Sequence, residues 1–164
     1  IDQRLGGRGR IVRAMPNTPM LAGRGMSAVC AGKNAKPADV AKAQRLLGAA
    51  GKVIRVPEEL MDAVTAVSGS GPAYFFYLTE LLAAAGVKVG LSEDDARLLA
   101  RVTFEGAAKL LAESAEGPQE LRRRVTSPGG TTEAAIKTFE SLGLAKIVAA
   151  AVEAARDRGR ELGR

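Results

Sequence analysis

The sequence predicts a predominantly helical protein in which a short α/β segment precedes an all-helical region. Three observations support this class. Short β-leaning runs bounded by Gly and Pro are confined to residues 1–57, and no convincing strand follows Glu58. Aromatic residues make up only 4% of the 164 residues, while Ala and Leu are abundant. This composition is typical of closely packed helices.

The α/β segment is expected to be the end of a sheet domain. Short strands are predicted over residues 11–15, 26–31 and 52–56. Two prolines in Met15-Pro16-Asn17-Thr18-Pro19 predict an extended loop after the first strand. A helix is predicted to begin at Pro37 and to close at Gly51. Strand, strand, helix, strand is the order found at the end of an α/β sheet.

The all-helical region begins at about residue 58. Its predicted helices are about 58–67, about 72–88, from Ser92 to Leu111, from Pro118 to Val125, about 132–142, and from Leu144 onward. The second of these is apolar almost all round, so we expect a partner chain to cover it. Glu80 interrupts its apolar run, which argues against a membrane span. Oligomerisation is therefore predicted.

Composition excludes several classes of function. The chain has no His, so it cannot form a Ser-His-Asp triad, a Cys-His pair or a histidine-bound metal site. The single Cys30 cannot form an intramolecular disulfide, and no signal peptide is visible, so a cytoplasmic protein is expected. The formal charge is +6, but the few aromatic residues are not interleaved with Lys or Arg, which argues against nucleic-acid binding.

One stretch, Arg124-Val125-Thr126-Ser127-Pro128-Gly129-Gly130-Thr131-Thr132-Glu133, places hydroxyl residues on both sides of a Pro-Gly-Gly break. It is not a P-loop, because no Lys follows the glycines and no strand precedes them. Unpaired amides at the start of the next helix, with the hydroxyls, could bind a small carboxylate or phosphate. The alternative is an ordinary helix cap, in which Thr131 bonds to the chain and Glu133 favours the helix dipole.

Other stretches also allow two interpretations. Ser68-Gly69-Ser70-Gly71-Pro72 permits either tight packing or ligand approach, and the Met15–Pro19 stretch is either a rigid turn or a ligand loop after a strand. The run Arg122-Arg123-Arg124 is a solvated face or part of the anion site. Glu58-Glu59 is most simply a first-turn pair, and Cys30 a small core residue of a strand.

Three motifs in one order, "MPNTP", "DAVTAVSGSGPAYFFYLTEL" and "VTSPGGTTEAAI", strongly resemble pyrroline-5-carboxylate reductase over essentially the whole chain. The resemblance implies a Rossmann domain followed by an all-helical dimerisation domain. Residues 1–57 are expected to be the C-terminal remnant of the first, and residues 58–164 the helical dimerisation and substrate-binding domain. It further implies NADPH- or NADH-dependent reduction of 1-pyrroline-5-carboxylate to L-proline, the last step of proline biosynthesis. Homodimers, and decamers built from them, are the implied assemblies.

The resemblance also assigns residues. Substrate binding is assigned to Ser127, Gly129, Gly130, Thr131 and Thr132, with Glu58 as a further substrate contact. Catalysis is assigned to Thr132, and positions at the cofactor to Pro16, Asn17, Thr18 and Arg124. No metal is implied.

The chain departs from the family pattern at its beginning. The family starts with a strand and a G-x-G-x-x-G turn that binds the cofactor pyrophosphate, whereas Gly6-Gly7-Arg8-Gly9 follows no strand and opens no helix. The main cofactor site is therefore expected to be missing, and the chain alone to be an inactive fragment. Two alternatives stay open: a non-catalytic self-association module, or a related two-domain reductase of another small carboxylate.

Overall fold

The computed structural model describes residues 5–163 of the chain. These residues form two compact units. The first unit contains the residues up to Tyr74 together with those from Ala150 onward, and the second contains Phe75–Ala149. Both boundaries between the units fall inside helices, and each unit is described below by itself.

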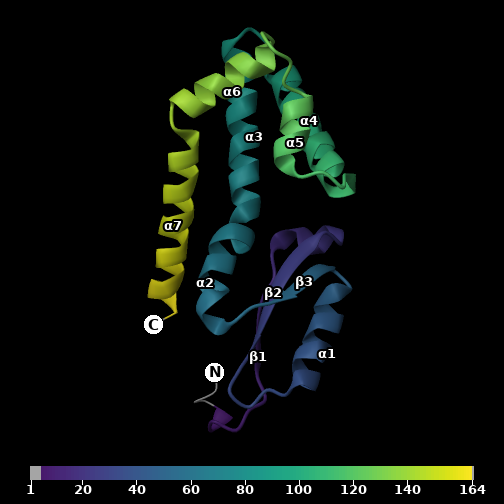
Figure 1. The fold of residues 1–164 in the computed structure, drawn as a ribbon, viewed down its shortest axis with the longest axis vertical. Helices are drawn as coiled ribbons and strands as arrows, with labels where there is room; N and C mark the ends of the chain where they lie inside the picture. The colour runs from purple at the N-terminus through teal and green to yellow at the C-terminus, as the bar shows by residue number, and fades with distance from the viewer. Residues whose placement is uncertain (1–4, 164) are drawn as a thin grey trace. The chain divides into compact units, whose positions relative to one another are not determined.

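The first unit contains a three-stranded sheet of order β1-β2-β3 (Figure 1). Strand β1 (Val12–Met15) pairs antiparallel with β2 (Gly25–Ala31). Helix α1 (Pro37–Gly48) then leads to β3 (Gly51–Arg55), which pairs parallel with β2. The predicted strand, strand, helix, strand order is confirmed.

Two predicted details of this segment are wrong. The loop after β1 is extended only to Asn17, because Thr18–Ala22 forms a 3-10 helix that Pro19, with its fixed φ, fits in the first turn. Helix α1 ends at Gly48 rather than at Gly51, which instead opens β3. Gly51 pairs with Gly25 there, and a Cβ at Gly51 would come within 1.9 Å of the Gly25 carbonyl oxygen.

The core of the first unit lies on β2. Ala28, Val29 and Cys30 are successive residues with at most 1% of their surface exposed, so both faces of this strand are covered. Met61, fully buried, packs with Ala28 and Cys30, and partly buried Met15, Val56 and Val64 surround this cluster. The prediction that Cys30 is a strand core residue is confirmed.

The segment after β3 is helical, as predicted, but it ends in a π-helical turn, which is wider than an α-helical turn. It runs through a 3-10 turn (Glu58–Leu60) and α2 (Met61–Val64) into a π-helical turn (Thr65–Gly69). The Ser70 amide donates to the Thr65 carbonyl at 2.8 Å, which is the i to i+5 bond of a π-turn. The Tyr74 hydroxyl donates to the Ala66 carbonyl at 2.9 Å and so satisfies an oxygen near the point where the next helix begins.

The remaining helices have the predicted order. They are α3 (Gly71–Lys88), α4 (Glu93–Glu113), α5 (Pro118–Arg124), α6 (Thr131–Ser141) and α7 (Leu144–Leu162). The predicted cap of α4 is confirmed, because the Ser92 hydroxyl accepts from the Asp95 amide at 3.1 Å.

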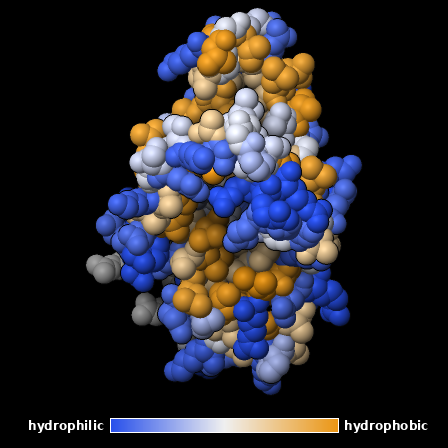
Figure 2. Space-filling view, turned by 45° about the horizontal axis from the view of Figure 1, so that its top comes forward, coloured by the Kyte–Doolittle hydropathy of each residue, from blue (hydrophilic) through white to orange (hydrophobic). Residues whose placement is uncertain are grey.

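The second unit leaves most of its large apolar side chains exposed. Within its described residues, Ala96 and Ala100 are the buried hydrophobic ones. On α3, Phe76 and Tyr77 remain 64% and 59% exposed, although Phe75 stacks on Phe104 of α4 with ring centroids 5.6 Å apart. Figure 2 shows hydrophobic residues at the surface of the helices. In residues 5–163, no helix is both long enough and apolar enough to cross a membrane.

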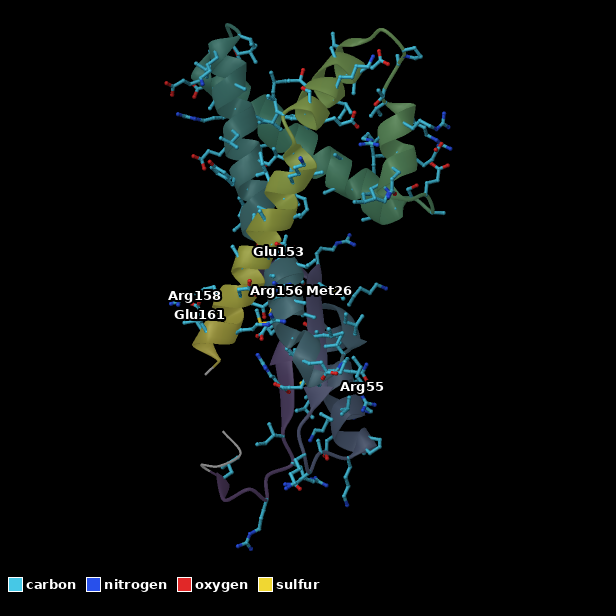
Figure 3. All side chains as sticks on the ribbon, turned by 60° about the vertical axis from the view of Figure 1, so that its left-hand side comes forward. Met26, Arg55, Glu153, Arg156, Arg158 and Glu161 are labelled. Carbon is cyan, nitrogen blue, oxygen red and sulfur yellow. The ribbon has the colours of Figure 1, made fainter. Side chains whose placement is uncertain are left out.

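The last part of α7 belongs to the first unit. Gly159 lies against Asp62 of α2, since a Cβ at Gly159 would be 3.4 Å from the nearer Asp62 oxygen. Arg158 and Glu161 form an exposed ion pair of 2.7 Å on this helix and point away from the sheet (Figure 3). The chain therefore completes its first unit with its last helix.

Candidate functional site

The loop between α5 and α6 is the main candidate site, and it lies in the second unit. Gly129 has a φ of +71°, in the left-handed region that glycine tolerates best. The Gly129 amide donates to the Glu133 carboxylate at 2.9 Å, and the Gly130 amide donates to the Ser127 carbonyl at 3.0 Å. These bonds fold the loop into a tight turn immediately before α6.

The start of α6 leaves a group of donors free. Ala134 is the first residue whose amide bonds back, to the Gly130 carbonyl at 3.2 Å. In the hydrogen bonds of residues 5–163, the amides of Thr131, Thr132 and Glu133 have no acceptor. The hydroxyls of Ser127, Thr131 and Thr132 also make no hydrogen bond there. Donors from both ends of the loop are thus available to an anion.

The ordinary-cap interpretation is only partly supported. The N-cap residue of α6 is Gly130 and no side chain caps it, so Thr131 does not make the bond that this interpretation expected. Glu133 does contribute, because its hydrogen bond from the Gly129 amide and then its contact with Lys137 lower its pKa. Lys137 lies 3.2 Å from Glu133 and offsets the negative charge that Glu133 brings to the loop.

Arg124, predicted at the cofactor, precedes this loop. Its guanidinium pairs with Glu116 and lies 3.5 Å from Glu120, while Arg123 binds Glu120 at 2.6 Å. Arg122 lies 4.0 Å from Glu140. Every cation of the run thus has a carboxylate partner, as a solvated face of α5 would have.

Glu58, in the first unit, has two partners that the sequence did not reveal. Arg13 and Cys30 are directly opposite each other in the β1–β2 ladder, so their side chains lie on the same face of the sheet. The Arg13 Nη1 donates to Glu58 Oε1 at 2.5 Å, and the Cys30 thiol donates to Oε2 at 2.7 Å. Arg13 also lies 3.9 Å from Asp62.

These contacts fix the charge state of the cluster. The hydrogen bond from Cys30, followed by that from Arg13, lowers the pKa of Glu58. Burial, followed by the hydrogen bond to Glu58, raises the pKa of the Cys30 thiol to about 11. Glu58 is therefore an anion and Cys30 a neutral thiol at neutral pH. An open depression of about 410 Å³ borders the cluster, lined by Cys30, Ala31, Arg55, Val56, Pro57 and Glu58.

Pro16, Asn17 and Thr18 follow β1 in the first unit, as predicted. The Asn17 carboxamide is held on both sides, because Oδ1 accepts from the Met26 amide at 2.8 Å and Nδ2 donates to the Ser68 carbonyl at 3.1 Å. The structure therefore connects two stretches that the sequence had marked separately, the Met15–Pro19 loop and the Ser68–Pro72 break.

The comparisons with known proteins agree with one another. Residues 58–162 match a family model described as pyrroline-5-carboxylate reductase dimerisation. A pyrroline-5-carboxylate reductase of Synechocystis sp. is 48% identical over 154 residues, which are 94% of this chain and 58% of that relative. The chain thus spans less than two thirds of the length of this curated relative.

Solved structures give the same result. A pyrroline-5-carboxylate reductase from Coxiella burnetii superposes with a TM-score of 0.91 at 41% identity, covering 98% of this chain and 60% of that one. A pyrroline carboxylate reductase from Plasmodium falciparum, solved with NADP bound, superposes with a TM-score of 0.87 at 34% identity. That match covers 99% of this chain and 62% of the Plasmodium chain.

Proposed function

Because the chain belongs to the pyrroline-5-carboxylate reductase family, we propose that the protein serves the NAD(P)H-dependent reduction of 1-pyrroline-5-carboxylate to L-proline. The observation that carries this proposal is the group of free donors at the start of α6. An iminium accepts hydride without a strong acid or base, so the lack of His is no obstacle. The protein has to hold the substrate in the right orientation.

The loop supplies that orientation through the substrate carboxylate. In this proposal Ser127, Gly129, Gly130, Thr131 and Thr132 form the carboxylate site, with the amides of Thr131 and Thr132 as main donors. The positive end of the α6 dipole adds to the field of these amides. Hydrogen bonds to a charged acceptor contribute about 1.5–3 kcal/mol each, so two or three could hold a small ligand in register.

Glu58 is the second proposed substrate contact. Both of its oxygens already accept a hydrogen bond, from Arg13 and from Cys30, and its pKa is lowered. At neutral pH such a group is ionised and carries no proton that it could donate. It would therefore act as a fixed negative charge toward the substrate rather than as a general acid.

The cofactor fits this chain only in part. The Met15–Pro19 loop follows the end of a strand, which is where nucleotides bind in α/β sheets, so Pro16 and Thr18 could border a nicotinamide. Within residues 5–163, no glycine-rich turn joins a strand to a helix for the pyrophosphate, and Gly6 and Gly7 precede β1. We assign a reduced nicotinamide as the hydride source.

Self-association belongs to the proposal as well. The exposed apolar side chains of α3 and α4 lie within the residues that match the family's dimerisation model. A homodimer through α3, α4 and α7 would cover them, and decamers would be built from such dimers. Sedimentation should show no stable folded monomer at micromolar concentration, and a folded monomer there would refute the dimer.

The alternative of a non-catalytic self-association module also predicts a dimer. The exposed apolar helices alone favour it, but it assigns no ligand to the free donors before α6. A related reductase of another small carboxylate would use the same donors. Titration with proline distinguishes a ligand site from a pure module, and turnover with different cyclic imines distinguishes the two reductases.

Thr132→Val is the decisive variant for the carboxylate site. In the native protein expressed from its own gene, we expect it to raise the Michaelis constant for the imine and to leave NADPH affinity almost unchanged. Thr138→Val is the matched control, because Thr138 lies on the same helix and its hydroxyl bonds to the Ala134 carbonyl at 3.0 Å. If Thr132→Val lowers the melting temperature but leaves the Michaelis constant alone, the loop is only a cap.

A further inference from the structure

We infer that Asn17 is a positioning residue, which fastens the Met15–Pro19 loop to β2 and to the π-helical turn instead of contacting the cofactor itself. This inference rests on the proposed function, because it concerns how the loop assigned to the nicotinamide is held. It also revises the role that the resemblance implied for Asn17. The three hydrogen bonds of one carboxamide carry it.

Those bonds use the carboxamide as both acceptor and donor. Oδ1 accepts from the Met26 amide on β2 at 2.8 Å (Met26 is labelled in Figure 3). Nδ2 donates to the Ser68 carbonyl at 3.1 Å and approaches the Ser68 hydroxyl at 3.4 Å. The carboxamide nitrogen thus has both of its acceptors on Ser68, so the carboxamide is engaged with protein groups at both of its ends.

The backbone of the loop is poorly able to fasten itself. Pro16 and Pro19 have no N–H group, so neither can donate to the sheet or to the π-turn. The amides of Met20, Gly23 and Arg24 donate only to carbonyls within residues 17–20. Hydrogen bonds from this loop to the π-turn therefore come from the side chain of Asn17.

A packing contact lies next to the hydrogen bonds of Asn17 with Met26 and Ser68, which we call the Asn17 latch. A Cβ at Gly69 would be 2.4 Å from Met15 Cε, so the Met15 side chain at the end of β1 lies directly against the π-turn. Met15 and Asn17 thus meet Gly69 and Ser68, two adjacent residues. Because π-turns interrupt the regular ladder and occur often at functional sites, a latch at this one fixes the loop where the helix is least regular.

The consequence for the reaction is geometric. Pro16 and Thr18 flank Asn17, so their position at a bound nicotinamide depends on the hydrogen bonds of Asn17. Displacement of a positioning element by about 1 Å can lower a rate by about a hundredfold while binding changes little. We therefore expect the loss of the latch to affect kcat more than the affinity for NADPH.

Two variants of Asn17, made in the protein as its own gene encodes it, distinguish the bond that Oδ1 accepts from Met26 from the bonds that Nδ2 donates to Ser68. Asn17→Ala removes all three bonds, whereas Asn17→Asp keeps the shape and the acceptor for Met26 but faces Ser68 with an oxygen. We expect both to lower kcat by about tenfold or more and to change the NADPH dissociation constant by less than about threefold. Asn34→Asp is the matched control, because Asn34 makes one exposed bond, to the Gly7 carbonyl at 2.8 Å.

Hydrogen exchange gives a readout that does not depend on turnover. The Met26 amide should exchange about tenfold faster in Asn17→Ala and at nearly the wild-type rate in Asn17→Asp. Because Asn17→Asp retains one bond, it keeps the test open if Asn17→Ala does not fold.

Three results would overturn the inference. They are an unchanged Met26 exchange rate in Asn17→Ala, an unchanged kcat in both variants, or an NADPH dissociation constant that rises more than kcat falls, which would make Asn17 a cofactor contact. Absence of turnover in the wild-type protein would refute the proposed function instead, and the exchange experiment would then decide the latch alone.

Discussion

Replacing Gly129 by alanine tests whether the shape of the α5–α6 loop matters. Gly129 has a φ of +71°, and a Cβ there would meet no atom within 4 Å. The cost of a side chain is therefore purely conformational, without a clash. Gly130 differs, because its φ of −83° is ordinary and a Cβ would lie 3.0 Å from the Ser127 carbonyl oxygen.

The magnitude follows from this conformation. A left-handed φ costs an alanine residue about 1–2 kcal/mol. In a chain of this size, each kcal/mol corresponds to a change of about 2–4 °C in melting temperature. Gly129→Ala should therefore lower the melting temperature by about 2–8 °C. It should also raise the Michaelis constant for the imine, because relaxation toward negative φ moves the donors of the loop.

Two further variants complete the test. Gly129→Asn should recover much of both effects, since asparagine tolerates the left-handed region. Gly48→Ala makes the same chemical change at a helical position that also has no atom within 4 Å, and should stabilise the protein by about 0.4–1 kcal/mol. Thermal denaturation and steady-state kinetics measure both effects. If Gly129→Ala and Gly48→Ala shift the melting temperature alike, the conformational argument is wrong.

Three other predictions concern the first unit. Met61→Ala should reduce the free energy of unfolding by about 2–5 kcal/mol in urea denaturation, because Met61 is fully buried, whereas Met61→Leu should cost less than about 1.5 kcal/mol. With a pKa of about 11, Cys30 should react slowly with iodoacetamide at pH 8 in the folded protein and faster toward pH 11; labelling at the rate of the unfolded chain would contradict this. The folded-state pKa of Glu58 lies below its unfolded value, so the stability that it adds is present above pH about 4.3 and lost as the pH falls through the folded pKa. Glu58→Gln should weaken that acid dependence, and an unchanged acid profile would argue against it.

The order of strands and helices could be predicted because each element has a local signal. β-leaning runs end at Gly or Pro, and Ser92 with an acidic first turn marks the start of α4. The π-turn could not be predicted, since Thr65–Gly69 has ordinary helical spacing in sequence. Its widening involves groups elsewhere, including the Tyr74 hydroxyl that reaches the Ala66 carbonyl.

The candidate site shows the same limit. The hydroxyls and glycines of the loop were visible in sequence, but Pro-Gly-Gly alone does not tell which glycine takes the positive φ, and in the structure it is Gly129. Glu58 was singled out without its partners. Arg13 and Cys30 meet it only through the register of β1 on β2, which is a tertiary property.

The division of the chain into units has a consequence for its synthesis. The first unit contains residues that are translated before Phe75–Ala149, yet it also includes Ala150 and the residues after it. The whole of Phe75–Ala149 must be translated in between, which takes several seconds at about 5–20 residues per second. Until Gly159 has been translated, Asp62 lacks the contact with α7 that it has in the complete first unit. The first unit can therefore be completed only by α7, after the whole of the second unit has been translated.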